Sequence, residues 1–402
     1  MIRFILLLGT LVSSLVFAQV RDEQFPVEAM LSAPFPTEIV VASDAAELAF
    51  VLNDRGARNI WHAAGPAFEA QQITTWTQDD GIGVSDLQFA AGGEKIVFVR
   101  GAGPNSAGEL PNPASLPQGV ELAIYAVAAS GGEPRKLDDG YGHAIHPSGE
   151  RVAYINKGKV WLIALDDPEA EATELFGARG GIGSLAWSPD GERLLFSSSR
   201  GTHSYIGIWQ SSGGQSSIRW LSPSVDRDVS PIWSPDGDRV AFIRLPTRDL
   251  DRFPFGPIRE DLPWSIRVAD PDTGDSIEVW RADEGRGSVI RRFESDSQIF
   301  WGDGDRLVFA WEKNGWNQLY SVPAKGGDPK HLTPGEFEIE YAALTKDGRS
   351  IVYASNQDDL HRRHIWEVGV KGGRPKLLTP GDGIEWAPAP LNDGSVALLR
   401  SD

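Results

Sequence analysis

Side chains that could form a catalytic centre are sparse in this sequence. No Gly-x-Ser-x-Gly segment, the nucleophile elbow of α/β-hydrolases, occurs in its 402 residues. His203 and Ser204 are adjacent, but a Ser-His-Asp site depends on proximity in space, and both residues fall in an expected loop between strands. We therefore assign no catalytic residue.

Two segments resemble metal sites only superficially. His361 and His364 are three positions apart, but we interpret residues 357–363 as a solvated loop before a strand at Ile365, and this is the alternative to a metal site. Residues 270–275 are rich in aspartate, as calcium loops are, yet Gly274 stands where an oxygen ligand is needed and Asp275 stands where glycine is needed. We interpret this second segment as a hairpin turn, and we expect neither a metal ion nor another cofactor.

Charged residues in two long insertions are better candidates for contact with a ligand. The insertions, residues 101–118 and 246–263, are rich in proline, glycine and polar residues. Long loops on a rigid scaffold often carry function. Glu109 in the first insertion, with Arg259 and Glu260 in the second, are the candidate substrate-binding residues; a solvated surface loop is the alternative for each.

A sequence repeat indicates the scaffold that carries these loops. The segment 187–196, WSPDGERLLF, returns as WSPDGDRVAF at 233–242, 46 residues later. Proline fixes φ at the first position of the turn, while aspartate and glycine supply the hydrogen bond and the positive φ that reverse the chain. Each copy is therefore expected to form a β-hairpin. Weaker copies occur at 42–50, 89–98, 145–154, 301–309, 344–353 and 390–398.

The residues that follow each hairpin predict a second pair of strands. An apolar pair, a glycine-rich turn and a short strand recur, as in 319–333 and 365–379. Four strands in a repeat of about 45 residues are typical of a β-propeller blade. The sequence thus predicts an all-β propeller over residues 38–402, with seven complete blades and a partial eighth. The alternative is a seven-bladed ring whose two ends pair across the seam.

Composition and the N-terminus set the compartment and exclude some partners. The net charge of −18, from 38 basic and 56 acidic residues, argues against nucleic acid as a partner, and the absence of cysteine excludes disulfides. Arg3, the apolar stretch 4–17 and Ala18 have the order of an export signal, and the stretch is too short to span a bilayer.

From these features we expect removal of a signal peptide at 1–18, a lead-in segment at 19–37, and a periplasmic or secreted protein that does not span the membrane once the signal is removed. An uncleaved signal anchor is the alternative.

The repeated motifs resemble those of a known family. The copies of Trp-Ser-Pro-Asp-Gly, and outer strands ending in Gly-Gly-x-Pro-x-x-Leu-Thr at 326–333 and 372–379, are similar to the propeller of dipeptidyl peptidase IV-like enzymes in the prolyl oligopeptidase family of serine peptidases. Similar WD40-like blades occur in the Tol-system propeller protein. The resemblance implies an eight-bladed propeller followed by an α/β-hydrolase domain, and these 402 residues contain no such domain. The Glu-Glu pair that binds the substrate amino terminus in dipeptidyl peptidase IV does not occur in this sequence.

The resemblance implies a role in proteolysis without a catalytic centre in this chain. We expect the exported, non-catalytic propeller portion of a prolyl oligopeptidase-like serine peptidase, which admits peptide substrates to a C-terminal hydrolase domain of the full-length protein. Whether the chain belongs to an enzyme stays open at this point. The alternative is a free-standing periplasmic propeller of the Tol type that binds other proteins as a scaffold.

Overall fold

A computed structural model describes residues 32–402, apart from 91, 106–107, 118, 248–259 and 402. The chain divides into residues 1–33 and a compact unit of residues 34–402, and the account below concerns the second unit. The expected signal peptide and nearly all of the lead-in segment lie outside the described residues. In the described part of the chain, no helix is long and apolar enough to cross a membrane.

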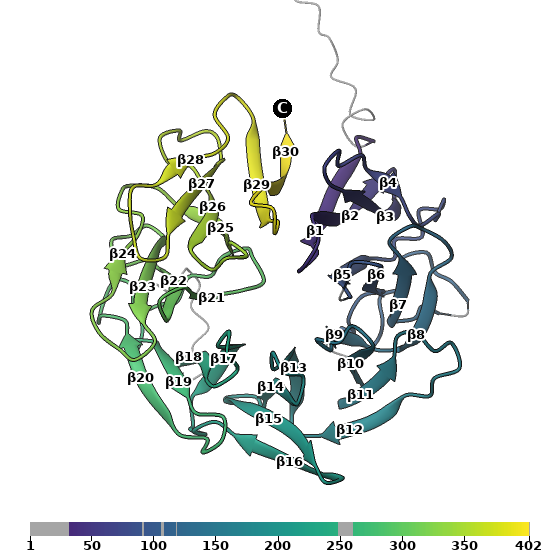
Figure 1. Ribbon diagram of the computed structural model, residues 1–402, viewed down its shortest axis with the longest axis horizontal. Coiled ribbons are helices and arrows are strands. Elements are labelled where there is room, and N and C mark those ends of the chain that lie inside the picture. The colour runs from purple at the N-terminus through teal and green to yellow at the C-terminus, as the bar shows by residue number, and fades with distance from the viewer. Residues whose placement is uncertain (1–31, 91, 106–107, 118, 248–259, 402) are drawn as a thin grey trace, which may run out of the picture. The chain divides into compact units, whose positions relative to one another are not determined.

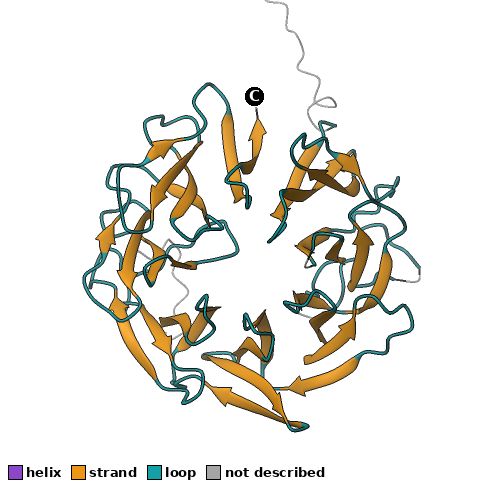
Figure 2. Cartoon of the chain, viewed as in Figure 1, coloured by secondary structure: helices purple, strands orange, loops and turns teal. Residues whose placement is uncertain are grey.

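The second unit consists of antiparallel sheets arranged around a central axis (Figures 1 and 2). The first four blades contain the strands β1 (Phe35–Val41), β2 (Glu47–Asp54), β3 (Ala57–Ala64) and β4 (Gln71–Gln72); β5 (Val84–Phe89), β6 (Lys95–Arg100), β7 (Ala123–Ala128) and β8 (Arg135–Asp139); β9 (Tyr141–Ile145), β10 (Arg151–Asn156), β11 (Lys159–Ala164) and β12 (Thr173–Gly177); and β13 (Gly181–Trp187), β14 (Arg193–Ser199), β15 (Ser204–Ser212) and β16 (Gln215–Trp220).

The remaining strands form three four-stranded blades and a two-stranded eighth. They are β17 (Arg227–Trp233), β18 (Val240–Leu245), β19 (Ser265–Ala269) and β20 (Ser276–Arg281); β21 (Ile299–Gly302), β22 (Arg306–Trp311), β23 (Gln318–Pro323) and β24 (Lys330–His331); β25 (Ile339–Leu344), β26 (Ser350–Ser355), β27 (His364–Gly369) and β28 (Lys376–Leu377); and β29 (Ile384–Pro390) and β30 (Val396–Ser401).

Strand pairing confirms the predicted propeller. Each of the first seven blades runs from its inner to its outer strand in chain order, and a parallel contact between Ser204 and Arg227 joins blades 4 and 5. In the eighth blade β29 pairs with β30 alone, and no pairing of β30 with β1 occurs among the described strands. The two ends meet instead through stacked rings, since Phe35 and Trp386 lie 6.5 Å apart at 20°.

The hairpin turns form because their residues satisfy their own polar groups. In the copy at 187–196, Ser188 Oγ accepts a hydrogen bond from the Arg193 amide at 2.9 Å, and Asp190 Oδ1 accepts one from the Glu192 amide at 3.0 Å. Ser188 Oγ in turn donates a 2.5 Å hydrogen bond to Asp190 Oδ1, and this bond, together with that from the Glu192 amide, lowers the pKa of Asp190. The seven turn glycines have φ between +71° and +85°, as the motif predicts, because glycine adopts this region without steric cost; they are Gly93, Gly149, Gly191, Gly237, Gly304, Gly348 and Gly394.

The hydrophobic core lies between successive blades. Seven clusters of buried apolar side chains join blade 1 to blade 2 and so on through blade 7 to blade 8. The tryptophan of the repeated motif contributes to these junctions, because Trp187 Nε1 and Trp233 Nε1 donate hydrogen bonds to carbonyls of the preceding inner strand. No such cluster joins blade 8 to blade 1 in the described part of the ring, so this seam is the weakest junction.

The inner strands carry a feature that the sequence did not indicate. Five of them contain a non-glycine residue with φ between +48° and +57°, each at a shift in strand register. A β-bulge of this kind bends a strand and re-aims its side chains. In blade 1 the bulge falls at Glu38, and β1 begins at Phe35, three residues before the expected start of the propeller. The other four bulged residues are Asp86, Ser184, Ser230 and Ala387.

Candidate functional site

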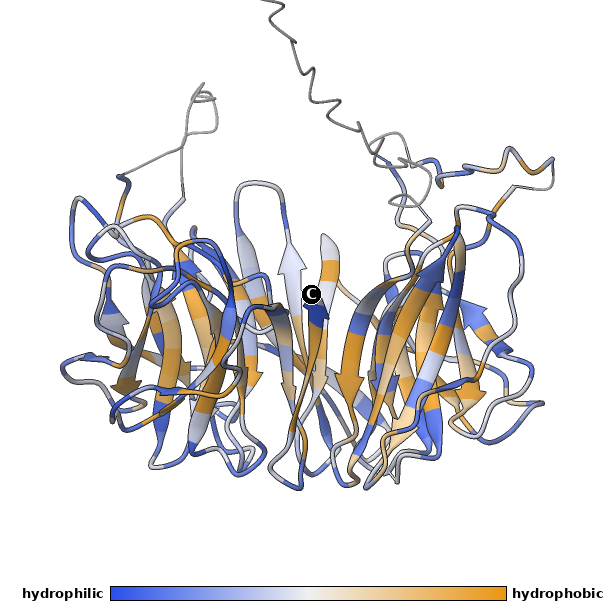
Figure 3. Ribbon diagram, turned by 90° about the horizontal axis from the view of Figure 1, so that it is seen from above, coloured by the Kyte–Doolittle hydropathy of each residue, from blue (hydrophilic) through white to orange (hydrophobic). Residues whose placement is uncertain are grey.

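The long loops share one face of the propeller. The first and second strands of each blade are joined by the short motif turn, so these turns lie at one face, and every second strand ends at the opposite face. The described ends of the insertions 101–118 and 246–263 follow the second strands β6 and β18 and belong to this opposite face, which we call the insertion face. The edge-on view separates the compact turns from the longer loops (Figure 3). The second strand β30 also ends at the insertion face, at Ser401.

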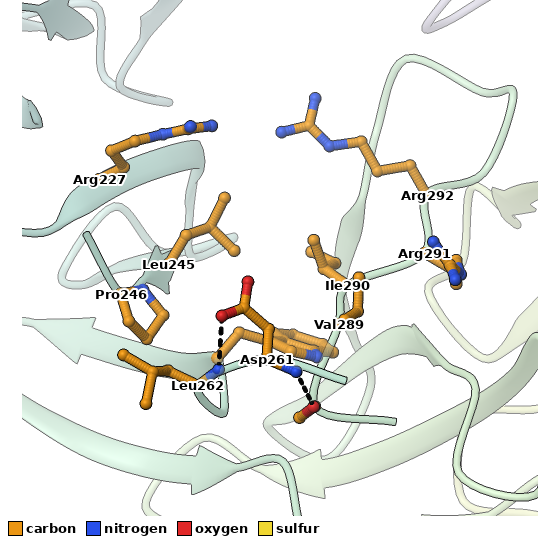
Figure 4. Close-up of a pocket in the computed structure, with 11 residues that line it drawn as sticks. Arg227, Leu245, Pro246, Asp261, Leu262, Val289, Ile290, Arg291 and Arg292 are labelled. Carbon is orange, nitrogen blue, oxygen red and sulfur yellow. Dashed lines mark hydrogen bonds between the residues drawn. The ribbon is translucent and has the colours of Figure 1, made fainter. Parts of the chain in front are cut away.

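A cavity of about 340 Å³ opens on the insertion face between blades 5 and 6. Three segments meet there: the ends of β17 and β18, the residues leading into β19, and the connection between β20 and β21. Arg227 and Arg292 reach toward each other from opposite sides, with the Asp261 carboxylate between and below them (Figure 4). We call this cavity the arginine pocket; its lining is completed by Leu245, Pro246, Leu262, Trp264, Ser288, Val289, Ile290 and Arg291.

The floor of the arginine pocket is fixed to the core. Ser288, with 1% of its surface exposed, accepts a hydrogen bond from the Asp261 amide at 2.7 Å and donates one to the Gly285 carbonyl at 2.6 Å. Beneath them Trp264 is buried, and its ring meets that of Trp280 edge-on at 4.8 Å. The described segment at 260–264 is thus held by both hydrogen bonding and packing, so the pocket is preformed.

Arginines around the pocket differ in their partners. Arg291 Nε donates a 2.6 Å hydrogen bond to Glu312, and Arg244 forms a buried two-bond ion pair with Asp228 at 2.7 and 2.8 Å. Arg227 and Arg292 form no ion pair with any residue that the structure describes. Because a guanidinium stays protonated at all physiological pH values, the pocket holds two positive charges at its rim, with the single Asp261 carboxylate below them.

Two further cavities continue from the arginine pocket toward the axis of the ring. One of about 310 Å³ shares Arg291 and Arg292 with it, and the central channel, about 800 Å³, shares Glu294 with that cavity in turn. Acidic side chains line both. Burial raises the pKa of Glu338 in the first, with the nearby charges of Glu312 and Glu340 adding to the effect.

Inner-strand bulges supply two of the four carboxylates that line the central channel, against one lysine, Lys346. Glu38 and Asp86, two of the bulged residues, line it together with Asp296. Glu38 accepts a 3.1 Å hydrogen bond from the Asp86 amide, and burial raises its pKa, as do the charges of Asp296 and Asp86. The path from rim to axis therefore runs from positive to negative charge.

The predicted substrate-binding residues do not converge in one place. Glu109 is exposed on the blade 2 insertion, where its amide and carboxylate both bond to Asn105. Glu260 is exposed at the edge of the arginine pocket, beside Asp261, and Arg259 lies outside the described residues. These assignments stay predictions. Sequence reasoning missed Arg227 and Arg292, which no motif distinguishes; the only signal was the cluster 259–261 in the insertion.

The other sequence candidates have structural roles. The turn at 270–275 joins β19 to β20, which confirms its interpretation as a hairpin. His364 is the first residue of β27, and its Nδ1 lies 2.9 Å from Glu385 Oε2. Ser204 Oγ donates to the Asp228 carbonyl, and the adjacent His203 ring packs on Tyr205. Within the described ranges no group of three His, Asp or Glu side chains is arranged to hold a metal ion.

The fold and the channel define a β-propeller, and similarity to known proteins specifies its kind. Residues 259–400 match the family described as "Dipeptidyl peptidase IV (DPP IV) N-terminal region". The resemblance seen in the sequence is confirmed over this segment, which is similar to the N-terminal propeller of prolyl oligopeptidase and dipeptidyl peptidase IV-like peptidases.

Individual relatives agree with this assignment. The chain is 26% identical over 243 residues to Tricorn protease homolog 1 of Streptomyces coelicolor, which covers 52% of the chain and 22% of that protein. It is 27% identical over 203 residues to the uncharacterized peptidase YuxL of Bacillus subtilis, covering 44% of the chain and 30% of that protein. The chain spans between 22% and 61% of the length of the curated relatives it matches.

A solved structure supports the fold independently. The structure of Porphyromonas gingivalis dipeptidyl peptidase 4 superposes with a TM-score of 0.60 at 13% identity, covering 89% of the chain and 55% of that protein. At this identity the likeness shows the propeller architecture alone.

Proposed function

We propose that this chain is the propeller of an exported serine peptidase, and that it controls the entry of peptides to a hydrolase domain bound at its insertion face. The propeller itself is non-catalytic in this proposal, since its sequence has no nucleophile elbow. Peptide hydrolysis is assigned to the hydrolase domain. Export rests on the signal-like residues 1–18.

One observation carries the proposal: the features suited to a peptide and to a second domain share a single face. The described ends of the two insertions and the arginine pocket belong to the insertion face, while the described connections of the opposite face are no longer than eight residues. Ligand sites in proteins are concave and built from few polar groups on a rigid scaffold. A domain placed on this face would enclose the pocket and one mouth of the channel.

Photo-crosslinking tests this placement. A benzoylphenylalanine at position 292, on the insertion face, is compared with one at position 393, in the exposed turn of the opposite face, in cells that produce the full natural gene product. We expect a crosslink from position 292 only, to a polypeptide segment that also reacts with a fluorophosphonate serine-hydrolase reagent. Crosslinks from 393 alone, or a crosslinked segment that the reagent does not label, would contradict the proposal.

A second candidate function, a Tol-type scaffold that binds other proteins, has one specific observation in its favour. An apolar groove of about 440 Å³ lies at the seam, between β30 and the side chains of Ile39, Phe50 and Phe68 in blade 1. The free edge of β30 offers unpaired backbone groups beside it, because β30 pairs only with β29 among the described strands. Such an edge accepts an extended strand of a partner protein.

The groove can be tested separately from the insertion face. A crosslinker at position 50 should capture an envelope protein in place of the hydrolase segment if the chain acts as a scaffold. Replacing Ala397 in β30 by proline should then abolish the capture, since proline cannot donate a backbone hydrogen bond. Capture that survives this change would contradict strand addition.

A further inference from the structure

Two arginines of the arginine pocket lack an ion pair with any described residue. Arg100, Arg239, Arg244, Arg291 and Arg363 are each paired with a carboxylate. Arg227 and Arg292 face one cavity from two sides, and neither pairs with a described residue (Figure 4). Two like charges across a cavity repel each other, and the Asp261 carboxylate below them supplies one negative charge against the two, so a further anion between the arginines stabilises the arrangement.

The rest of the lining specifies the chemistry of that anion. Leu245, Val289 and Ile290 provide an apolar surface directly beside the two guanidinium groups. Leu262, another lining residue, leaves 59% of its surface exposed to solvent. A phosphate or sulfate would leave this surface uncovered. A carboxylate that carries an aliphatic group would pair with the arginines, and its aliphatic group would cover this apolar surface.

We propose that the arginine pocket binds a carboxylate of a peptide, with an aliphatic side chain next to it on the apolar floor. Guanidinium groups bind carboxylates through two parallel N–H donors, which fixes the orientation of the ligand as well as its charge. Asp261 limits the space between the arginines, and its Oδ1 accepts a hydrogen bond from the Leu262 amide at 2.8 Å. This inference rests on the proposed function, because it names the substrate class of the same face.

The neighbouring cavities make the pocket selective for one end of the ligand. Glu294, Glu338 and Glu340 line the cavity that leads toward the axis, and Glu38, Asp86 and Asp296 line the channel beyond it. A carboxylate is repelled from these regions, whereas an amino terminus is attracted to them. A peptide held by its carboxylate in the arginine pocket would therefore extend with its amino end toward the channel.

Calorimetry with short peptides tests the proposal on the purified 402-residue chain. The probe is Ala-Ala-Leu with a free C-terminal carboxylate, and the same peptide with a C-terminal amide is the comparison. A third peptide, acetylated, amidated and carrying one internal glutamate, distinguishes a side-chain carboxylate from the terminal one. We expect binding of at least one carboxylate peptide and loss of binding when every carboxylate is removed. Equal binding of the fully amidated peptide without glutamate, or binding of none of them, would overturn the proposal.

Substitutions locate the binding. Arg227→Gln and Arg292→Gln should each weaken binding of the preferred peptide at least about tenfold, or 1.4 kcal/mol, since each substitution removes a charge-assisted hydrogen bond. Lysine at either position should retain part of the affinity. Arg374→Gln is the matched control, because Arg374 is exposed, forms no ion pair with a described residue, and lies in the turn between β27 and β28, away from the pocket.

An equal effect of R374Q and R227Q would show that only net charge matters, and would overturn the assignment to the pocket. Urea unfolding of each variant confirms that the fold is intact. The outcome is independent of the hydrolase: a chain that binds the carboxylate but is not crosslinked at position 292 to a serine hydrolase would keep the pocket and lose the proposed function. A chain that is crosslinked at position 292 to a serine hydrolase but binds no carboxylate would keep the proposed function and lose the pocket.

Discussion

Trp233 Nε1 donates a 3.1 Å hydrogen bond to the carbonyl of Ala186, which belongs to the inner strand of the preceding blade. The bond repeats one blade earlier, from Trp187 to Ala144 at 3.2 Å. The Arg193 guanidinium lies over the Trp233 ring, with 5.0 Å between its central carbon and the ring centroid. The tryptophan of the repeated motif is thus a polar link between blades in addition to an apolar one.

Trp233→Phe should therefore destabilise the protein by more than its burial suggests. The substitution leaves the Ala186 carbonyl without its donor, at a cost of about 1–3 kcal/mol. Trp209→Phe is the matched control, because Trp209 is more deeply buried but its Nε1 has no hydrogen-bond partner among the described residues. We expect W233F to lower the free energy of unfolding in urea at least as much as W209F. A clearly larger loss for W209F would show that burial alone decides.

Repetition explains why so much of the fold could be predicted from the sequence. A blade cannot bury its faces alone, so the same turn and the same apolar runs recur in each copy, and counting the copies predicts seven blades and a partial eighth. The turn glycines were predictable because their φ of +71° to +85° excludes most other residues. The inner-strand bulges could not be predicted, because the bulged position has no common residue type: it is Glu38, Asp86, Ser184 or Ala387 in different blades.

The arginine pocket could not be predicted for a different reason. Arg227, Asp261 and Arg292 belong to three segments separated by more than thirty residues each, and only the stacking of blade 5 on blade 6 brings them together. Charge clusters in an insertion indicated the right loop through residues 259–261 but not its partners. Contacts between blades depend on the rotation of each blade about the axis, which a local pattern does not encode.

Two glycines near the ends of the blade 2 insertion differ in the space around their Cα atoms. Gly101 has φ of +126°, and a Cβ there would lie 2.5 Å from the Glu121 carbonyl oxygen. Gly119, near the other end of the insertion, has φ of +79° and open space around it. We expect Gly101→Ala to cost about 3 kcal/mol or more, from strain and overpacking together, and Gly119→Ala about 1 kcal/mol. Chemical denaturation measures both, and equal costs would contradict the close approach.

The pair formed by Arg239 and Asp305 links the turns of blades 5 and 6. Two hydrogen bonds of 2.9 and 3.0 Å join the side chains, which are 34% and 41% exposed. The bonds from Arg239, together with its charge and a bond from Trp301, lower the pKa of Asp305. Because solvent screens the pair, we expect a coupling of only about 0.5–1 kcal/mol in a double-mutant cycle of R239Q and D305N.

The sign of the pH dependence follows from the lowered pKa of Asp305. The coupling should be fully present above the carboxyl's unfolded pKa, about 3.9, and should disappear as the pH falls through the lower folded value. High salt should reduce it at neutral pH. A coupling that persists at pH 2 would show that contact between the side chains, and not charge, holds the turns together.

A buried histidine, His143 of β9, lies beside the channel residue Asp86. Its side chain is buried, neither ring nitrogen has a hydrogen-bond partner among the described residues, and Nδ1 lies 3.4 Å from Asp86 Oδ2. Burial lowers the pKa of His143, although the charge of Asp86 opposes the shift. The unfolded chain therefore binds a proton more readily than the folded one between the lowered pKa and the usual value of about 6.5.

Stability should then fall as the pH is lowered from 7 to 5, by at most about 1.4 kcal/mol per pH unit from this group. His143→Gln removes the titration, so the free energy of unfolding in urea should decline less steeply with acid in the variant than in the wild type. The exposed His361→Gln variant is the control for loss of an imidazole. Parallel profiles of H143Q and wild type between pH 7 and 5 would contradict the prediction, because they would show that the pKa of His143 is the same in the folded and the unfolded chain.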